Sequence, residues 1–275
     1  PYTSSPWSIY NLAVLLGYKI NWAAFNLTFF NQIRMGPRII PVPKKGIEKK
    51  LAGIVKRIAN VVNIEDVMDI PLQNHCPPEY FALASGQEKA IEDNYHPVPI
   101  ARFVRQHEIE NGVLKGDEFG ESQTFPCDKN ERIEALCEEN PKVAIICRYN
   151  LQIDTLIRLL APSHTLYIIR GDTKDRDTVC RAAEAAERAV VLLQSDCGLG
   201  FDLPSFSLCV FASMSFSYSS WEQTCGRFLR MNKPSRTTFL YLLTEEDSMD
   251  QAVYNAIQNK KDFSAELYAK TRSGL

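Results

Sequence analysis

The chain has 275 residues, of which 45% are hydrophobic and 23% charged, and its 31 Lys and Arg against 33 Asp and Glu give a formal charge of −2. This ordinary globular composition excludes a disordered tail, a collagen-like repeat and a domain held to nucleic acid by bulk positive charge. No apolar stretch approaches the roughly 18 residues of a membrane span. Residues 1–6 carry no Met and no basic run before an apolar one, so we expect a fragment or processed product rather than a secretory leader.

The first 70 residues are rich in aromatic side chains at helical spacing, with a Pro-punctuated break at 36–43. We expect a helical segment there. Eight basic residues lie between Arg34 and Arg57 against a single acid, Glu48. Two interpretations of this basic stripe stay open: a solvated helix face, or a surface that contacts a phosphate backbone.

The cysteines and histidines indicate a reducing compartment. No two of the 8 cysteines lie closer than ten residues, which excludes a Cys-x-x-Cys zinc or redox unit. Several sit in apolar runs, where a reduced thiol behaves as a small hydrophobe. Nothing near the His75-Cys76 pair supplies further ligands. We therefore expect reduced cysteines, a cytoplasmic location and no metal site.

Residues 143–260 alternate between two patterns. Segments with the apolar spacing of a helix lie between or after short apolar runs. Asp172 and Thr173 are the expected caps of the second helix. Apolar strands that alternate with helices indicate an α/β fold with a parallel sheet covered on both faces. The expected strands are 143–147, 166–169, 189–193, 208–212 and 238–243, and the expected helices are 151–160, 174–188, 221–231 and 248–260.

Residues 71–130 give no clear pattern, because prolines interrupt them repeatedly. An Asp117-Glu118 pair lies in this region without the apolar strand that precedes a Walker B motif, so we interpret it as a loop.

The loop after the third strand is a first candidate site. It runs from Gln194 to Leu203 and contains Gly198 and Gly200. Ligands gather outside the carboxyl ends of parallel strands, and small residues there let the backbone approach a phosphate. The run does not fit a dinucleotide fingerprint, because no helix follows at once, and a plain turn remains the alternative.

The segment after the fourth strand is a second candidate. Ser219 and Glu222 have the spacing of a capping box, so we expect a helix to begin there. Gly226 inside that helix costs about 1 kcal/mol relative to Ala, so we expect something to approach its backbone closely.

Gln223, Arg227 and Arg230 fall at i, i+4 and i+7 of the same helix, on one face. Two arginines on a rigid face suit a polyphosphate, because guanidinium is always charged and binds in bidentate fashion. A surface helix whose arginines are solvated or paired with acids is the alternative. The chain has no G-x-x-x-x-G-K-[S/T] motif, so the main cradle for a nucleoside triphosphate would lie elsewhere.

Together these features resemble the second half of a superfamily-two helicase motor, of the type found in Swi/Snf-type DNA translocases and their phage and bacterial relatives. The most specific match is the motif VI pattern Gln-x-x-Gly-Arg-x-x-Arg, here from Gln223 to Arg230. The chain has Asp202 where the family usually has Asn, and Asn232-Lys233 where it has Gly-Gln. The other similar segments are 143–148 with Asn150 (motif IV), 170–172 with Arg176 (the short motif after it) and 194–202 (motif V).

The resemblance extends over nearly the whole chain. Residues 1–16 resemble the sequence after motif III, 56–71 the linker between the two motor lobes, and 244–261 the segment after motif VI. It implies a helical remnant of the first lobe with the linker over 1–70, and a RecA-like second lobe over 71–275.

The resemblance implies a DNA-dependent ATP hydrolase as the parent protein. ATP and Mg²⁺ would be bound mainly by a first RecA-like lobe missing from this chain, and duplex DNA would be translocated without unwinding. Arg230 first, and Arg227 second, would reach the γ-phosphate across the cleft. The remaining implied residues are Gln223, Gly198, Gly200 and Asp202 toward the nucleotide, and Arg148, Asn150, Thr173 and Ser195 toward the nucleic-acid backbone.

Two other classes of function stay open. The chain could be a non-catalytic α/β module that docks nucleic acid or protein. It could also be a small-molecule enzyme that uses the loop of Gly198 and Gly200. The second is disfavoured because all 4 histidines lie outside the motif loops.

Overall fold

A computed structural model of the chain describes residues 6–35, 38–44, 46–47, 50–51, 53–54, 73–116, 120–197, 202–228, 236–245 and 247–264. The chain divides into two compact units, Pro1–Met68 and Asp69–Leu275. Within the described ranges no helix is long and apolar enough to cross a bilayer.

The first unit contains two helices and a β-hairpin. Helix α1 spans Pro6–Leu15 and α2 spans Trp22–Phe29, and strands β1 (Phe30–Met35) and β2 (Arg38–Pro43) pair antiparallel. The expected helices are confirmed, whereas the hairpin was not expected. The helix-face interpretation of the basic stripe is therefore wrong at its start, because residues 34 and 38 lie on strands. The core of this unit consists of Ile9, Phe25, Phe29, Phe30, Ile47 and Leu51.

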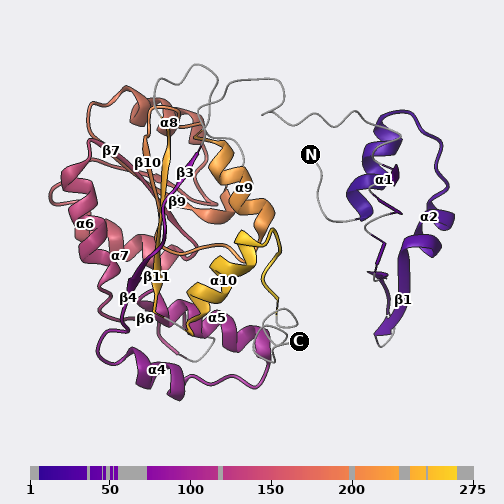
Figure 1. Ribbon diagram of the computed structural model, residues 1–275, viewed down its shortest axis with the longest axis horizontal. Helices are drawn as coiled ribbons and strands as arrows, with labels where there is room; N and C mark the ends of the chain where they lie inside the picture. Colours follow the sequence, from indigo (N-terminus) through magenta and orange to yellow (C-terminus); the bar gives the residue numbers. More distant parts are fainter. Residues whose placement is uncertain are drawn as a thin grey trace. The chain divides into compact units, whose positions relative to one another are not determined.

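The second unit is built on a parallel sheet (Figure 1). Its strand order is β3–β11–β10–β7–β9–β8, and β4 also pairs with β11. Every pairing in this sheet is parallel. The five strands expected from the sequence are confirmed to within a residue or so. The strands are β3 (Asn74–His75), β4 (Glu79–Phe81), β7 (Lys142–Cys147), β8 (Leu166–Ile169), β9 (Ala189–Gln194), β10 (Leu208–Phe211) and β11 (Thr238–Thr244).

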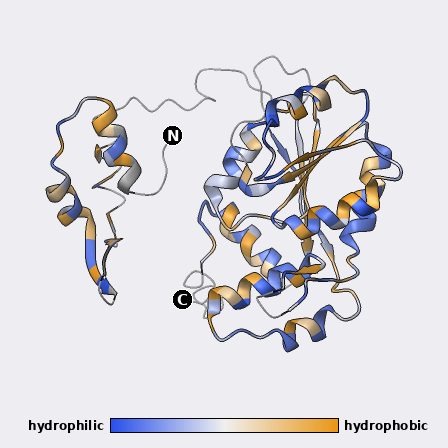
Figure 2. Cartoon of the chain, turned by 180° about the vertical axis from the view of Figure 1, so that it is seen from behind, coloured by the Kyte–Doolittle hydropathy of each residue, from blue (hydrophilic) through white to orange (hydrophobic). Residues whose placement is uncertain are grey.

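Helices cover both faces of this sheet, which confirms the expected RecA-like α/β fold (Figure 1). Side chains alternate along each strand, so Val143 and Ile145 of β7 join one core while Ala144 and Ile146 join the other. The covering helices carry apolar residues next to polar ones (Figure 2). One core includes residues of α6 (Lys129–Glu139) and α7 (Asn150–Leu160), and the other includes residues of α8 (Arg176–Ala185), α9 (Tyr218–Gly226) and α10 (Met249–Gln258).

The order of the strands creates a switch point beside β7. From β7 the chain runs to β8 and β9 on one side, and then crosses to β10 on the other side. At such a point the loops at the carboxyl ends diverge and leave a crevice, which is where ligands bind in open α/β sheets. The candidate loops after β7, β9 and β10 all lie at this edge.

The region that gave no clear sequence pattern is structured over most of its length. It forms α4 (Gln87–Asp93), α5 (Pro99–Glu110), β5 (Val113–Leu114) and β6 (Gln123–Thr124). Helix α5 begins with a proline at its first position, where the missing N–H is tolerated. The Asp117-Glu118 pair lies outside the described residues.

Two expected helix starts are wrong. Helix α8 is capped by Asp175, whose side chain accepts from the Thr178 N–H, rather than by residues 172 and 173. Helix α9 is capped by Ser217, whose hydroxyl accepts from the Ser220 N–H. In both cases a second capping residue a few positions away takes the role.

Gly226 is the last residue of α9 rather than an interior one. A Cβ atom added there would meet no described atom within 4 Å. The expected close approach to its backbone is therefore wrong for the part of the chain that the structure describes.

Candidate nucleic-acid and nucleotide interface

Three loops converge on Arg148 at the carboxyl edge of the sheet. The Arg148 N–H donates to Ser213 Oγ over 2.8 Å, and its guanidinium Nη1 lies 3.4 Å from Ser215 Oγ. The Ser215 hydroxyl in turn donates to Asp196 Oδ1 over 3.1 Å. These bonds connect the loops after β7, β9 and β10, so the cation is held at the switch point of the sheet.

An aromatic ring also holds the Arg148 side chain. Its guanidinium carbon lies 4.0 Å from the centroid of the Phe216 ring. A cation over an aromatic face is attracted by about 0.5–2 kcal/mol, depending on exposure. Arg148 is half-buried, whereas Asn150 is exposed at the first position of α7. A phosphate at this position would meet the fixed positive charge of Arg148 and, at Asn150, the positive end of the α7 helix dipole.

The loop after β8 is fastened to the loop after β9. Arg176 Nη2 donates to the Arg170 carbonyl over 3.1 Å, and the Gly171 N–H donates to Gln194 Oε1 over 3.2 Å. The Thr173 hydroxyl accepts from the Arg170 N–H over 2.9 Å. Thr173 thus closes the turn of this loop, at the edge where the sequence placed it.

Ser195 is buried, with 3% of its surface exposed. Its hydroxyl oxygen has no hydrogen-bond partner among the residues that the structure describes, and its carbonyl accepts from Ser220 Oγ over 3.0 Å. Ser195 therefore joins the motif V loop to α9 from inside the fold. Gly198 and Gly200 lie outside the described residues.

The motif V and motif VI segments meet at Asp202 and Arg227. A carboxylate oxygen of Asp202 lies 3.8 Å from Arg227 Nη1, and the Leu203 N–H donates to the Arg227 carbonyl over 3.2 Å. The two side chains are 50% and 28% exposed, so the pair is screened by water. Gln223 is exposed on α9, and its amide donates to Ser219 Oγ over 3.2 Å. Arg230 lies outside the described residues.

Several residues of this edge were not expected from the sequence. Asp196, Ser213, Ser215 and Phe216 connect the loops around Arg148. The available signal was the serine-rich run directly after the fourth strand, which continues into α9. Small hydroxyl side chains at the carboxyl end of a buried strand suit hydrogen bonds between loops.

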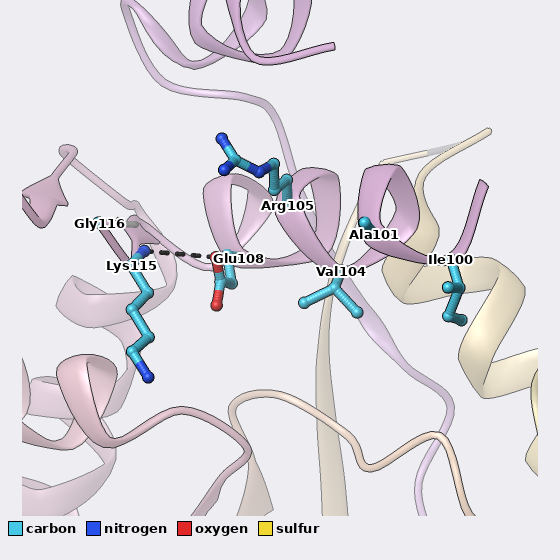
Figure 3. Close-up of a pocket in the computed structure, with 7 residues that line it drawn as sticks. All are labelled: Ile100, Ala101, Val104, Arg105, Glu108, Lys115 and Gly116. Atoms are coloured by element: carbon cyan, nitrogen blue, oxygen red, sulfur yellow. Dashed lines mark hydrogen bonds between the residues drawn. The ribbon is translucent and has the colours of Figure 1, made fainter. Parts of the chain in front are cut away.

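A pocket of about 390 Å³ lies along α5 (Figure 3). Glu108 lines it and accepts a hydrogen bond from the Lys115 N–H over 3.3 Å. Burial raises the pKa of the Glu108 carboxyl. Val104 and Glu108 extend to one side of the helix and Arg105 to the other (Figure 3). The other residues that line the pocket are Ile100, Ala101 and Gly116.

The described residues include no group of three or more His, Cys, Asp or Glu side chains that could hold a metal ion. Both ring nitrogens of His75 have protein neighbours, Tyr241 Oη at 2.7 Å and Gln73 Oε1 at 2.7 Å.

Residues 128–232 match the helicase conserved C-terminal domain. This match includes the loops after β7, β8, β9 and β10 and the motif VI segment, and it confirms the helicase part of the resemblance. No curated protein matches the chain. Among solved structures, the chain is similar to the C-terminal part of the Fun30 ATPase domain at 18% identity and a TM-score of 0.44. The alignment covers 53% of this chain and 48% of that one, so the chain spans about half the length of that structure.

Proposed function

We propose that this chain is the second lobe of an ATP-dependent nucleic-acid translocase of the Swi/Snf type. The observation that carries the proposal is the meeting of Asp202 and Arg227, which brings the motif V and motif VI segments together. The helicase match over 128–232 supports it, because it covers both segments.

The proposed chemical role of this lobe is to supply arginines to ATP. Bound ATP with Mg²⁺ supplies the phosphoryl group to be transferred, and a first lobe holds both. Arg230 and Arg227 would stabilise the charge that spreads over that group in the transition state, an effect worth about 10³–10⁵ in turnover. Gln223, Asp202 and the loop of Gly198 and Gly200 would order the same side of the cleft.

The proposed nucleic-acid contact is the carboxyl edge around Arg148. Arg148 and Asn150 present a cation and a helix start to a phosphate backbone, and Thr173 lies on the neighbouring loop. Contacts of this kind position a protein on duplex DNA without reading its sequence. The buried Ser195 would contribute by fixing the motif V loop.

The test is ATP turnover by the chain extended upstream through the expected first lobe, with and without duplex DNA. Arg230→Ala should abolish DNA-stimulated turnover and leave the Tm unchanged. The matched control is Arg181→Ala, since Arg181 is an exposed arginine on α8 that forms an ion pair with Asp177 one turn away. Normal turnover in Arg230→Ala would refute the role of that arginine.

The second candidate function is a non-catalytic docking module. It is favoured by the charge pair itself, since the arginine that would have to reach ATP lies 3.8 Å from the Asp202 carboxylate. Under this alternative the extended, folded protein would bind DNA with an affinity that ATP does not change, and it would show no turnover.

A further inference from the structure

A cluster of buried charges lies beside the candidate interface and has no part in the proposed chemistry. Asp250, at the start of α10, is 2% exposed and His107 of α5 is fully buried. Asp250 forms an ion pair with the buried Lys129, and its Oδ2 accepts from the Thr244 N–H over 3.1 Å. Its Oδ1 accepts from Asn111 Nδ2 over 3.0 Å. The carboxylate is thus held charged by fixed donors.

The same carboxylate orients the His107 ring. His107 Nε2 lies 2.9 Å from Asp250 Oδ1. The contact is one of charge and distance, since Nε2 makes no aligned hydrogen bond among the described residues. Because a carboxylate only accepts, this contact favours the tautomer that has the proton on Nε2 and leaves Nδ1 as an acceptor. Burial lowers the pKa of His107, which keeps the ring neutral. Burial acts to raise the pKa of Asp250, but the charge of Lys129 and the contact with His107 outweigh it and hold that pKa below its usual range.

The free acceptor of His107 is used by Tyr149. The Tyr149 hydroxyl lies 2.6 Å from His107 Nδ1, and in this tautomer the hydroxyl donates. Tyr149 is the residue between Arg148 and Asn150, so the bond fixes the backbone of the motif IV loop. The chain Asp250–His107–Tyr149 therefore runs from the core to the loop that carries the candidate nucleic-acid contacts.

His107 also supports the ring beneath Arg148. Its ring packs edge-on against Phe216 at 5.2 Å between centroids and against Tyr149 at 5.5 Å. Phe216 in turn lies 4.0 Å below the Arg148 guanidinium. His107 thus contacts both the chain neighbour of Arg148 and the ring beneath its guanidinium, in addition to the bonds that Ser213 and Ser215 make to Arg148. His107 and Asp250 lie outside the segment that matches the helicase domain.

We propose that His107 and Tyr149 are positioning residues that hold the Arg148 guanidinium in place for a phosphate of the nucleic-acid backbone. The inference rests on the proposed function in one respect, namely that Arg148 contacts nucleic acid. The positioning itself can be measured without DNA.

The first experiment measures the position of Arg148 directly. A guanidinium over an aromatic ring has shifted NMR resonances, so the Arg148 Nε–H signal of the full chain reports its contact with Phe216. Tyr149→Phe removes one hydroxyl and keeps the ring. We expect the Arg148 signal to move toward that of a solvated arginine. The Tm should fall modestly, because the buried His107 Nδ1 loses its partner. The matched control is Tyr254→Phe, which removes a half-buried hydroxyl on α10 and should leave the signal in place. An unmoved signal in Tyr149→Phe would overturn the proposal.

The second experiment measures binding of the full chain to a fluorescent duplex oligonucleotide. Tyr149→Phe should weaken binding about three- to tenfold, the range expected for loss of one hydrogen bond. If Tyr149 acts through Arg148, the double variant with Arg148→Ala should bind no more weakly than Arg148→Ala alone. In each variant the plot of log binding constant against log salt concentration should also become less steep, by about 0.9, because one phosphate contact is lost. Additive losses would overturn the proposal.

The two experiments test separately whether Arg148 contacts nucleic acid and whether Tyr149 positions Arg148. Wild-type affinity in Arg148→Ala would refute the nucleic-acid role of Arg148 under the proposed function, and the NMR signal would still decide whether Tyr149 positions it. If Tyr149→Phe failed to fold, Phe216→Leu would replace it, because this variant removes the ring beneath the guanidinium. The same signal shift and the same non-additive binding loss are then expected.

Discussion

Glu110 offers the sharpest test of the buried network, because its charge state changes near neutral pH. Its carboxylate accepts from the Met249 N–H over 2.9 Å and from the Asp250 N–H over 3.0 Å, at the start of α10. The side chain is 2% exposed. Burial, together with the charge of Asp250, raises the pKa of Glu110 to about 7.

The sign of the effect follows from proton binding. In the unfolded chain a glutamate releases its proton near its ordinary pKa of about 4.3. Between that pH and about 7, folded Glu110 still holds its proton. Stability therefore falls as pH rises through this window, by at most 1.4 kcal/mol per pH unit and by about 4 kcal/mol in total. The contribution is complete below the unfolded pKa and lost above about pH 7.

His107 has the opposite effect in part of the same range. Burial lowers its pKa, so the unfolded chain binds more protons than the folded one as pH falls below about 6.5, and stability falls. The wild-type curve alone therefore mixes two trends. Glu110→Gln separates them, because the amide has the shape and charge of the protonated carboxyl. Relative to Glu110→Gln, the wild type should gain about 2–3 kcal/mol between pH 7.5 and pH 5.

The assay is urea unfolding at four pH values from 5 to 8, followed by circular dichroism and extrapolated to water. Glu187→Gln is the matched control, because Glu187 is exposed. Its stability should follow the wild-type curve. A constant difference between wild type and Glu110→Gln across this pH range would refute the assignment of a neutral carboxyl at the start of α10.

Three further predictions test other parts of the molecule. Lys129→Met should cost about 3–5 kcal/mol, because it leaves the charge of Asp250 buried without its cation, and thermal unfolding measures the loss. Asp202→Asn should change stability by less than about 0.5 kcal/mol, because its pair with Arg227 is half exposed. In the extended protein the same variant should lower the KM for ATP, because the Asp202 carboxylate no longer competes for the arginine. Residues 1–47 contain no Asp or Glu, so Arg34→Glu on the hairpin should weaken binding to duplex DNA and flatten its salt dependence if the basic stripe contacts phosphates. Unchanged binding in a titration at two salt concentrations would exclude that contact.

The strands of the sheet were predicted well because each is recognisable from a short stretch of the sequence. Each strand of the core is a short run of apolar, mostly β-branched residues, and burial on both faces requires that pattern. Helix starts were predicted less well, because the chain offers several capping residues close together. Ser217 and Ser219 compete for one helix start, and Asp172 and Asp175 for another. Only the geometry of the preceding loop decides which side chain reaches the free N–H groups.

The N-terminal hairpin was missed for a different reason. Its second strand contains Pro41 and Pro43, and prolines argue against a strand in the interior of a sheet. A two-stranded ribbon has two free edges, where the missing N–H groups cost little. The same prolines limit pairing of this strand with another strand.

In the candidate site, only the residues that belong to sequence motifs were predicted. Arg148, Asp202 and Arg227 carry a pattern that is visible in the sequence, whereas the groups that hold them come from far along the chain. Asp250 lies 143 positions from His107 in sequence and 2.9 Å from it in space. No local spacing encodes such a pair, and a histidine within a proline-broken, acidic region gives no sign of being buried.

The buried pair of His107 and Asp250 suggests how substitutions far from the motifs could affect the candidate interface around Arg148. Arg148 and Tyr149 lie in the matched helicase segment, but the histidine and the carboxylate that orient Tyr149 come from α5 and α10, on either side of that segment. Under the proposed function, a substitution in those helices would therefore alter the contact of Arg148 with a phosphate backbone without changing any motif residue. A well-packed buried network has few alternative arrangements. We therefore expect such substitutions either to leave the position of the Arg148 guanidinium unchanged or to release it from Phe216, with few intermediate positions.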